Sequence, residues 1–231
     1  EHAPAYREVT IAPHPDRRLG FAEADPSSDI DGLDTRHKTT LSADIAFGVD
    51  VDDEKVDAFG IRTVKKCDID AAKAEGYVLK LFGASLRNEN GVAAFVEPTL
   101  VPADTPEGNI HGCDNVIAFE GSHIGKTRFI GAGAGRYPTG YAVAQDLMDI
   151  ELGLGVLYNE SLTVTEVNNA SERHAYYVRT DFTADAYFAA LEKRPFGQGF
   201  VTEETSVREM HDFAARAKEA GKEIFIAGFW K

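Results

Sequence analysis

The spacing of apolar residues predicts helices and paired strands in the first two thirds of the chain. Residues 34–47 repeat apolar positions every three to four residues, as a helix does, and Gly48 is placed to end it. A short helix capped by Asp68 is expected over 69–75. Four strands are expected as two hairpins: 77–86 with 92–101 around Asn90-Gly91, and 115–119 with 127–130.

A second pattern begins after Asn168, Asn169 and Ser171, which mark a candidate domain boundary. Strands and helices are expected to alternate there: strand 175–179, helix 184–193, strand 199–202, helix 207–220 and strand 223–228. Ser206 and Glu209 have the spacing of a capping box at the start of the last helix.

These elements predict an α+β protein. A mostly antiparallel or mixed sheet covered by helices on one face is followed by a small β-α-β-α-β unit. The predicted division is an irregular lead-in over 1–19, which is rich in proline and charge, then a larger domain over 20–167 and the small domain over 172–231.

Composition narrows the function classes. The 231 residues are 43% hydrophobic, and no apolar run approaches the roughly 18 residues of a membrane helix, so no membrane-spanning segment is expected. Lys and Arg number 24 against 38 Asp and Glu; the net charge of 24 − 38 = −14 argues against nucleic-acid binding. The chain has only two cysteines, which is typical of proteins from a reducing compartment, so we expect a cytoplasmic protein. The seven histidines lack metal-ligand spacing, so no metal site is expected.

Three motifs resemble known ligand loops and fail in detail. Asp29-Ile30-Asp31-Gly32 resembles the centre of a calcium loop, but Lys38 falls where that loop needs a bidentate Glu. Residues 121–127 are one residue short of a phosphate-binding loop, and we expect a hairpin turn there. The run Gly131-Ala132-Gly133-Ala134-Gly135-Arg136 lacks the third glycine of a dinucleotide fingerprint.

That glycine-dense turn nevertheless keeps two properties of a ligand site. It precedes Pro138 and a helix expected from Thr139 to about Glu151, so glycine backbone and a helix N-terminus come together. The arrangement suits an anionic or planar ligand. The alternative is a turn that only needs positive φ, and these residues alone leave both interpretations open.

Asp34 and Lys38 share one side of the first long helix with Leu41 and Ile45, at positions i, i+4, i+7 and i+11. We expect this stripe to face the core, which would partly desolvate both charges. Burial favours a neutral amine while the adjacent carboxylate opposes that shift, and groups tuned in this way collect at reactive sites. Lys38 is therefore either a catalytic or substrate-binding residue or half of a structural ion pair.

Several segments resemble homoserine dehydrogenases, in the same order. Gly20-Phe21-Ala22-Glu23-Ala24-Asp25-Pro26, followed by Asp29, Gly32, Asp34 and Lys38, resembles the substrate-site segment of that family. Further similar segments are 46–49, 76–81, 97–102 and the turn 131–135 with Pro138-Thr139. The resemblance covers roughly residues 20–148.

The resemblance implies the reduction of aspartate 4-semialdehyde to homoserine with NADP or NAD as cofactor, in a homodimer. The implied roles are catalytic for Lys38 and Asp34, substrate-binding for Phe21, Glu23 and Asp29, and cofactor-binding for Gly131, Gly133 and Gly135. Hydride transfer builds negative charge on the aldehyde oxygen, and a lysine ammonium can stabilise and protonate that oxygen.

The resemblance also sets limits. The family's N-terminal nucleotide-binding domain has no counterpart before Glu1, so we expect these residues alone to be inactive. The small C-terminal unit stands where many family members carry an ACT domain. Its expected order is one strand short, and Asp181-Phe182-Thr183 lacks the Pro-Gly that opens the first ACT helix, which argues against feedback control by threonine. The alternative function is a non-catalytic oligomerisation or amino-acid-sensing module derived from the family.

Overall fold

A computed structural model describes residues 5–10, 25, 27–112, 114–133, 135–154 and 162–229. Its helices are α1 (Ser27–Ile30), α2 (Leu33–Phe47), α3 (Lys66–Ala74), α4 (Arg136–Glu151), α5 (Ala186–Ala190) and α6 (Val207–Glu219), with a 3-10 turn at Asp53–Lys55. Its strands are β1 (Ala5–Thr10), β2 (Val49–Val51), β3 (Asp57–Ala58), β4 (Tyr77–Asn88), β5 (Gly91–Pro102), β6 (Asp114–Gly121), β7 (Gly125–Ala132), β8 (Thr163–Thr165), β9 (Arg173–His174), β10 (Tyr176–Thr180), β11 (Lys193–Phe196), β12 (Gly199–Thr202), β13 (Thr205–Ser206) and β14 (Ile224–Phe229).

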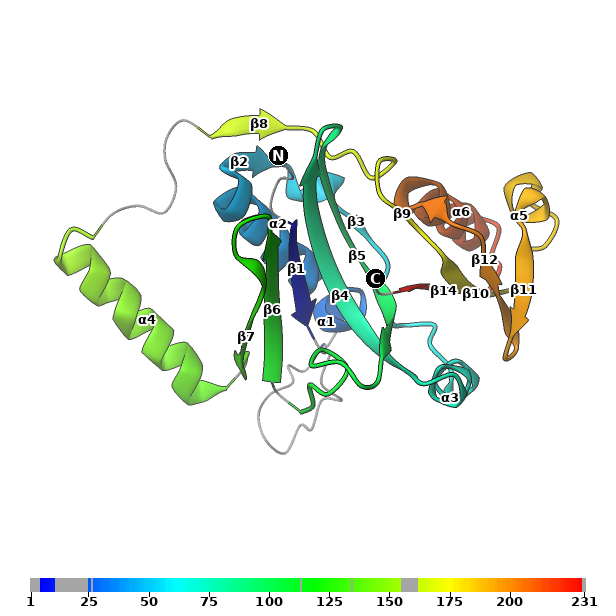
Figure 1. Cartoon of the computed structure of the whole chain (residues 1–231), viewed down its shortest axis with the longest axis horizontal. Helices are drawn as coiled ribbons and strands as arrows, with labels where there is room; N and C mark the ends of the chain where they lie inside the picture. Colours follow the sequence, from blue (N-terminus) through cyan, green and yellow to red (C-terminus); the bar gives the residue numbers. More distant parts are fainter. Residues whose placement is uncertain are drawn as a thin grey trace.

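One mixed sheet runs through the whole molecule (Figure 1). It has ten strands, in the order β11-β12-β10-β14-β5-β4-β1-β6-β7, and β3 pairs with β5 as well. Most neighbours are antiparallel, whereas β14 and β3 run parallel to β5. The predicted α+β class, with a mixed sheet and helices, is confirmed.

The two predicted hairpins are present and longer than expected. β4 and β5 pair from Asn88 opposite Gly91 to Tyr77 opposite Pro102. Gly91 has a φ of 111°, which suits glycine because a Cβ would be strained there, so the chain can reverse at once. β6 and β7 pair as far as Gly121 opposite Gly125, which confirms a hairpin turn between them.

The expected irregular lead-in over 1–19 is wrong for residues 5–10. These residues form β1, an interior strand that pairs antiparallel with β4 on one side and β6 on the other. The segment is short and is flanked by Pro4 and Pro13, so its composition resembles that of a loop. Two distant neighbours supply its hydrogen bonds, and a local pattern cannot show such long-range pairing.

α2 packs on the sheet through small and polar residues. Its buried side chains are those of Thr35, Thr39, Thr40, Ala43, Asp44 and Phe47. Thr39 approaches Gly83 of β4 so closely that a Cβ there would lie 1.8 Å from the threonine Oγ1. That hydroxyl donates to the carbonyl oxygen of Thr35 at 2.7 Å. The helix ends at Gly48, whose φ is 64°, as predicted.

Two other helices begin earlier than expected. α3 begins at Lys66 instead of residue 69, so Asp68 lies within the first turn instead of capping it. The Asp68 carboxylate accepts a hydrogen bond from the backbone N–H of Lys65 at 2.8 Å and so satisfies a backbone donor at the helix N-terminus. α4 begins at Arg136 instead of Thr139.

The C-terminal unit contributes four strands to the main sheet, where the sequence predicts three. These strands and their helices follow one another as β10-α5-β11-β12-α6-β14, and the strands lie in the order β11-β12-β10-β14, while the short strands β9 and β13 pair in a separate sheet. This β-α-β-β-α-β arrangement with its two split halves is the ferredoxin-like motif. The extra strand, Lys193–Phe196, begins at the last residue of the helix expected over 184–193 and continues through residues for which no element was expected, and α5 is shorter than that helix. The capping box of Ser206 and Glu209 on α6 is confirmed.

The largest core cluster crosses the predicted domain boundary. It combines Phe59 and Leu100 from the first part with Tyr176, Phe213 and Phe225 from the second, all at most 3% exposed. Burial of aromatic and aliphatic side chains of this size is the main stabilising contribution in a core. β14 also pairs with β5, so the C-terminal unit shares both a core and a sheet with the rest.

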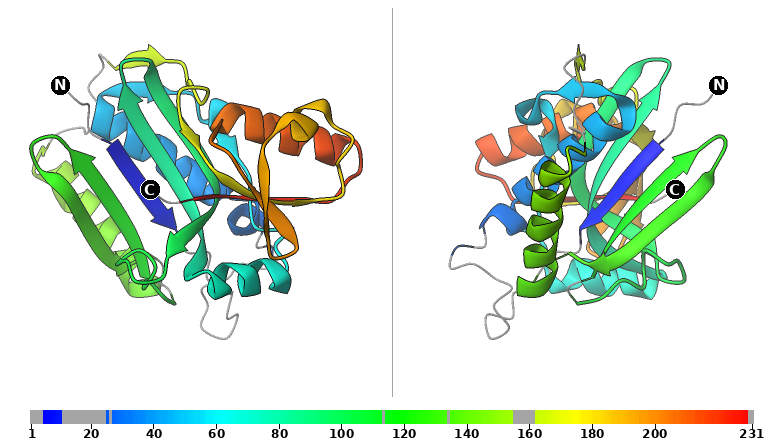
Figure 2. Two further views of the ribbon diagram at one scale, coloured as in Figure 1. Left: turned by 45° about the vertical axis from the view of Figure 1, so that its right-hand side comes forward. Right: turned by 90° about the vertical axis from the view of Figure 1, so that its left-hand side faces the viewer.

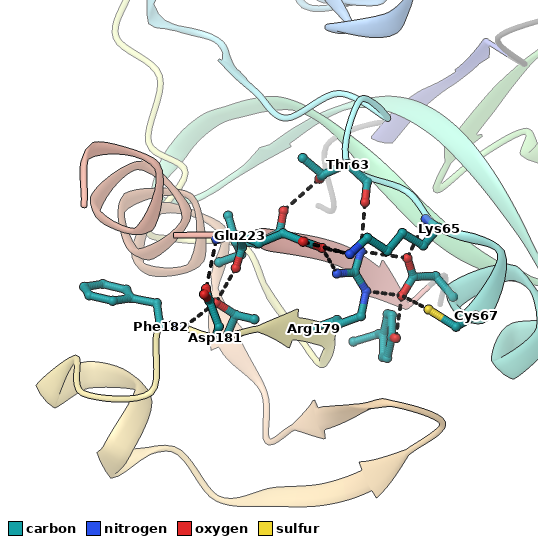
Figure 3. Close-up of polar contacts among 11 residues, drawn as sticks. Thr63, Lys65, Cys67, Arg179, Asp181, Phe182 and Glu223 are labelled. Carbon is teal, nitrogen blue, oxygen red and sulfur yellow. Dashed lines mark hydrogen bonds and ion pairs between the residues drawn. The ribbon is translucent and has the colours of Figure 1, made fainter. Parts of the chain in front are cut away.

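A buried ion network adds to this joint (Figure 3). The guanidinium of Arg179 on β10 donates to both carboxylate oxygens of Asp68 on α3, at 2.8 and 3.0 Å, and to the carbonyl oxygen of Thr63 at 2.8 Å. It also bonds Glu223, which Lys65 pairs with from the other side. The network fastens α3 to β10 and to the start of β14.

α4 lies outside the packed body. It extends beyond the edge strand β7 (Figure 1) and lies behind the β6–β7 hairpin in the left view of Figure 2, and none of its residues is buried. Its exposed side chains include Tyr137, Tyr141, Leu147 and Ile150. Among the described residues, no helix has the length and apolar character needed to cross a membrane.

Candidate functional site

A cleft of about 500 Å³ lies between α2 and the β6–β7 hairpin. Lys38, Leu41 and Ser42 of the helix form one wall. The other wall comes from the hairpin and the turn after it, through Asn115, Ile117, Phe129, Ile130, Gly131, Ala132 and Gly133. The cleft therefore brings a predicted catalytic residue, Lys38, together with two of the predicted cofactor-binding glycines.

Lys38 and Asp34 form an ion pair at the rim of this cleft. Nζ of Lys38 lies 2.8 Å from Oδ2 of Asp34, and the two side chains are 38% and 39% exposed. Both residues are on the first turns of α2, four positions apart, so the helix itself sets their distance. The carboxylate orients the amine, and water still reaches both groups.

The prediction that their stripe faces the core is wrong. Leu41 and Ile45 are 50% and 53% exposed, and α2 turns its threonines and Ala43 toward the sheet instead. The close contact with Gly83 favours small side chains on the packed face, and the larger aliphatic residues are left on the open side. Leu41 lines the cleft next to Lys38, so the stripe borders a cavity and is not part of the core.

The glycine turn presents bare backbone to the cleft. A Cβ on Gly131 would meet no atom within 4 Å, so this residue leaves its peptide open to a ligand. A Cβ on Gly133 would instead overlap the side chain of Asn115, so a larger residue there would displace that side chain from its position on β6. Gly135, with a φ of 123°, directly precedes α4 and its N-terminal dipole.

The predicted substrate-binding residues are only partly covered by the structure. Phe21 and Glu23 lie outside the described residues. Asp29 is half-buried in α1, which contacts α2. Its neighbour Asp31 accepts two hydrogen bonds from Arg62, at 2.7 and 2.8 Å, and this guanidinium lowers the pKa of the Asp31 carboxyl. Asp31 is thus committed to a structural pair.

Sequence reasoning missed the side chains that form the opposite wall. Asn115 and Ile117 are two positions apart on β6, and Phe129 and Gly131 are two apart on β7, so each pair shares one face of the sheet. The alternation was visible in the sequence, but it does not tell which face α2 covers. Within the described part of the chain, no group of metal-binding side chains gathers that could hold an ion.

The cleft brings together an ammonium group, an apolar wall and glycine backbone, a set that is compatible with reduction of a carbonyl group when a hydride donor is bound. An ammonium held by a carboxylate can stabilise negative charge that develops on an oxygen, and the effect grows where water is partly excluded. Ile117 and Phe129 supply an apolar wall, and the glycine turn allows a planar ring to approach the backbone. The same parts would also suit simple binding of a small anion.

Comparison with known proteins places this arrangement in a family. The family model described as homoserine dehydrogenase matches residues 12–148. The homoserine dehydrogenase of Lactococcus lactis is 35% identical over 158 residues, which is 66% of this chain and 37% of that protein. A protein of Pseudomonas canavaninivorans named NAD(+)-dependent homoserine dehydrogenase is 35% identical over 133 residues, or 57% of this chain and 38% of its own length.

The solved structures extend the similarity to the C-terminal unit. A homoserine dehydrogenase from Thiobacillus denitrificans superposes on 100% of this chain with a TM-score of 0.77 and 25% identity, and 65% of that chain is covered. The sequence matches are partial, since the chain spans less than two fifths of the length of the two curated relatives above. The family model nevertheless covers more than half of the chain, and the chain belongs to the homoserine dehydrogenase family.

Proposed function

We propose that this chain provides the substrate-binding and catalytic side of a homoserine dehydrogenase, which reduces aspartate 4-semialdehyde to homoserine with NADH or NADPH. The observation that carries the proposal is the shared cleft. Lys38 lines one side of it, and Gly131 and Gly133 line the other side together with apolar side chains. Family membership supports the reaction type.

In the proposed mechanism, Lys38 acts on the aldehyde oxygen. As hydride reaches the carbonyl carbon, negative charge develops on that oxygen, and the Lys38 ammonium stabilises it and donates the proton. Asp34 pairs with the amine at 2.8 Å and so holds it in position at the cleft. We further propose that Phe21, Glu23 and Asp29 bind the rest of the substrate, as the family resemblance implies.

The glycine turn fits the cofactor's part of the reaction. A nicotinamide supplies the hydride when it is bound, and it would lie against Gly131, Gly133 and Gly135. Open space at Gly131 leaves the peptide plane accessible there. A relative named NAD(+)-dependent supports a nicotinamide cofactor. The choice between NAD and NADP, the homodimer and the cytosolic location stay predictions.

The direct test of the substrate side is binding of homoserine to the 231-residue chain, measured by titration calorimetry. We expect wild-type chain to bind homoserine and Lys38→Met to bind it at least tenfold more weakly, because the hydroxyl loses its cationic partner. Lys66→Met on α3 is the matched control, since Lys66 is 86% exposed and does not line this cleft. Equal affinity of Lys38→Met and wild type would reject the assignment.

We also propose that these residues alone do not turn over. The 231 residues carry no Gly-x-Gly-x-x-Gly fingerprint, so the pyrophosphate of the cofactor lacks its usual backbone site. The chain alone should therefore not oxidise NADPH in the presence of aspartate semialdehyde. An enzyme of the relatives' length that contains both this chain and the fingerprint should oxidise it. Turnover by the chain alone would reject this part of the proposal and leave the role of Lys38 in place.

A second function, amino-acid sensing by the C-terminal unit, is favoured by one finding. That unit has all four strands of a ferredoxin-like motif, so it is not the reduced unit that the sequence predicts. Calorimetry with threonine separates the two sites. Threonine binding that survives Lys38→Met would place the ligand in the C-terminal unit, and no binding would leave the unit a structural role.

A further inference from the structure

A second cleft, of about 550 Å³, lies between α3 and the first residues of β4. Its lining shares no residue with the cleft that holds Lys38, so the two are separate sites. Its walls are mostly aliphatic, with Ile61, Val64, Ile69 and Leu79 among them, and Tyr77 adds an aromatic ring. A cleft of this size is within the range that small-molecule sites usually have.

Lys80 brings a buried positive charge to this cleft. The residue is 9% exposed, and its Nζ donates a hydrogen bond to the carbonyl oxygen of Ile110 at 2.6 Å. Within the described part of the chain, no ion pair joins this amine to a carboxylate, and burial alone lowers its pKa. A buried ammonium without a counter-charge is costly, and lysine is seldom buried unpaired.

The other polar side chains of the cleft have the same sign or are neutral. Lys73 and His111 stand on its lining, and no Asp or Glu does among the described residues. This is a local reversal in a chain whose net charge is −14. An anion would supply the charge that Lys80 lacks, whereas the ammonium group of an amino acid would find no acidic partner in the cleft.

We propose that this cleft binds a small monocarboxylate with a branched aliphatic tail and no amino group, its carboxylate on Lys80 and its tail against Ile61, Val64 and Ile69. The aliphatic walls favour the tail, and the lysines on the lining, with no acidic residue among the described lining residues, disfavour the ammonium group of an amino acid. This site goes beyond the proposed reaction and does not depend on it.

The experiment compares two ligands that share one tail. Titration calorimetry on the 231-residue chain uses 4-methyl-2-oxopentanoate and leucine, which differ in the oxo and ammonium groups. We expect the oxo acid to bind and leucine to bind at least tenfold more weakly. Leucine binding as tightly as the oxo acid would overturn the proposal, and so would failure of the oxo acid to bind.

Two variants locate the site. Lys80→Met keeps the length of the side chain and removes its charge, and should weaken oxo-acid binding at least tenfold, whereas Lys66→Met should leave binding unchanged. Ile69 is 49% exposed on α3, so Ile69→Trp can fill the cleft without entering the core, and it should also abolish binding. If Lys80 only holds the segment around Ile110, Lys80→Met lowers the melting temperature, and both Lys80→Met and Ile69→Trp bind the oxo acid as wild type does. That result rejects the proposal.

Discussion

At the scale of single residues, Glu97 shows what a buried charge requires. Its carboxylate is 2% exposed, and it accepts hydrogen bonds from Nε2 of His174 at 2.7 Å, Nε2 of His211 at 2.9 Å and the hydroxyl of Tyr176 at 3.0 Å. An ionised carboxylate only accepts, so both imidazoles must carry their proton on Nε2. The donors come from the C-terminal unit and the acceptor from β5, so this cluster too joins the two parts.

The Glu97 cluster predicts how stability depends on pH. Burial raises the pKa of Glu97, but His174 and His211 outweigh burial through charge and hydrogen bonds, so the pKa falls from 4.5 to about 2. A lowered pKa stabilises the fold above about pH 4.5, and that contribution is lost as the pH falls toward 2. Urea unfolding should show a steeper loss of unfolding free energy between pH 5 and pH 3 in wild type than in Glu97→Gln. Parallel curves for the two proteins would contradict this.

For Lys38, the sequence predicted the ion pair with Asp34 but not the direction in which the pair faces. The four-residue spacing from Asp34 to Lys38 predicts an ion pair on one helix face, and the pair is present. The direction of that face depends on which side chains of α2 meet Gly83, a contact between residues far apart in sequence. The prediction that the pair is buried is therefore wrong. Lys38 nevertheless lines a cleft.

At the scale of elements, the sequence predicted those that carry their own signals. The β4–β5 hairpin has a glycine at its turn, and α6 has a capping box at its start, and both are where expected. β1 and β11 were missed because each is short and gains its stability from pairing with neighbours. Signals for such strands lie in the tertiary contacts and not in the strand itself.

The joint between α3 and β10 provides a test with an internal control. Asp68→Ala removes the partner of Arg179 and Tyr177 in a site where Asp68 is 1% exposed, and should lower the unfolding free energy by about 3–5 kcal/mol. Asp70 on the same helix pairs with Lys66, and both side chains are largely exposed, so Asp70→Ala should cost at most about 0.5 kcal/mol. Urea unfolding of both variants measures the difference. Similar losses for the two would show that the buried network does not fasten α3.

At the scale of the whole molecule, the mixed sheet and its class were predicted, but its continuity was not. The boundary near residues 168–171 separates two sequence patterns, yet β14 pairs with β5 and one core crosses the boundary. Periodicity indicates elements and their order. It does not show that the edge strand of one unit continues the sheet of the other.

This continuity predicts cooperative unfolding. Because the two parts share a sheet, a core and two buried polar clusters, scanning calorimetry of the chain should show one transition whose calorimetric and van't Hoff enthalpies agree. Two separated transitions would show that the parts fold independently and that their contact contributes little.

In the proposed reaction, Lys38 acts on the substrate's oxygen in the cleft that it shares with the glycine turn. The decisive experiment measures kcat for aspartate semialdehyde reduction by an enzyme of the relatives' length that carries these residues, with Lys38→Met beside Lys66→Met. We expect Lys38→Met to lower kcat by a factor of about 10² or more, with the Kd for NADPH near that of wild type and Lys66→Met unchanged. A Lys38→Met enzyme with kcat within about threefold of wild type would contradict the account.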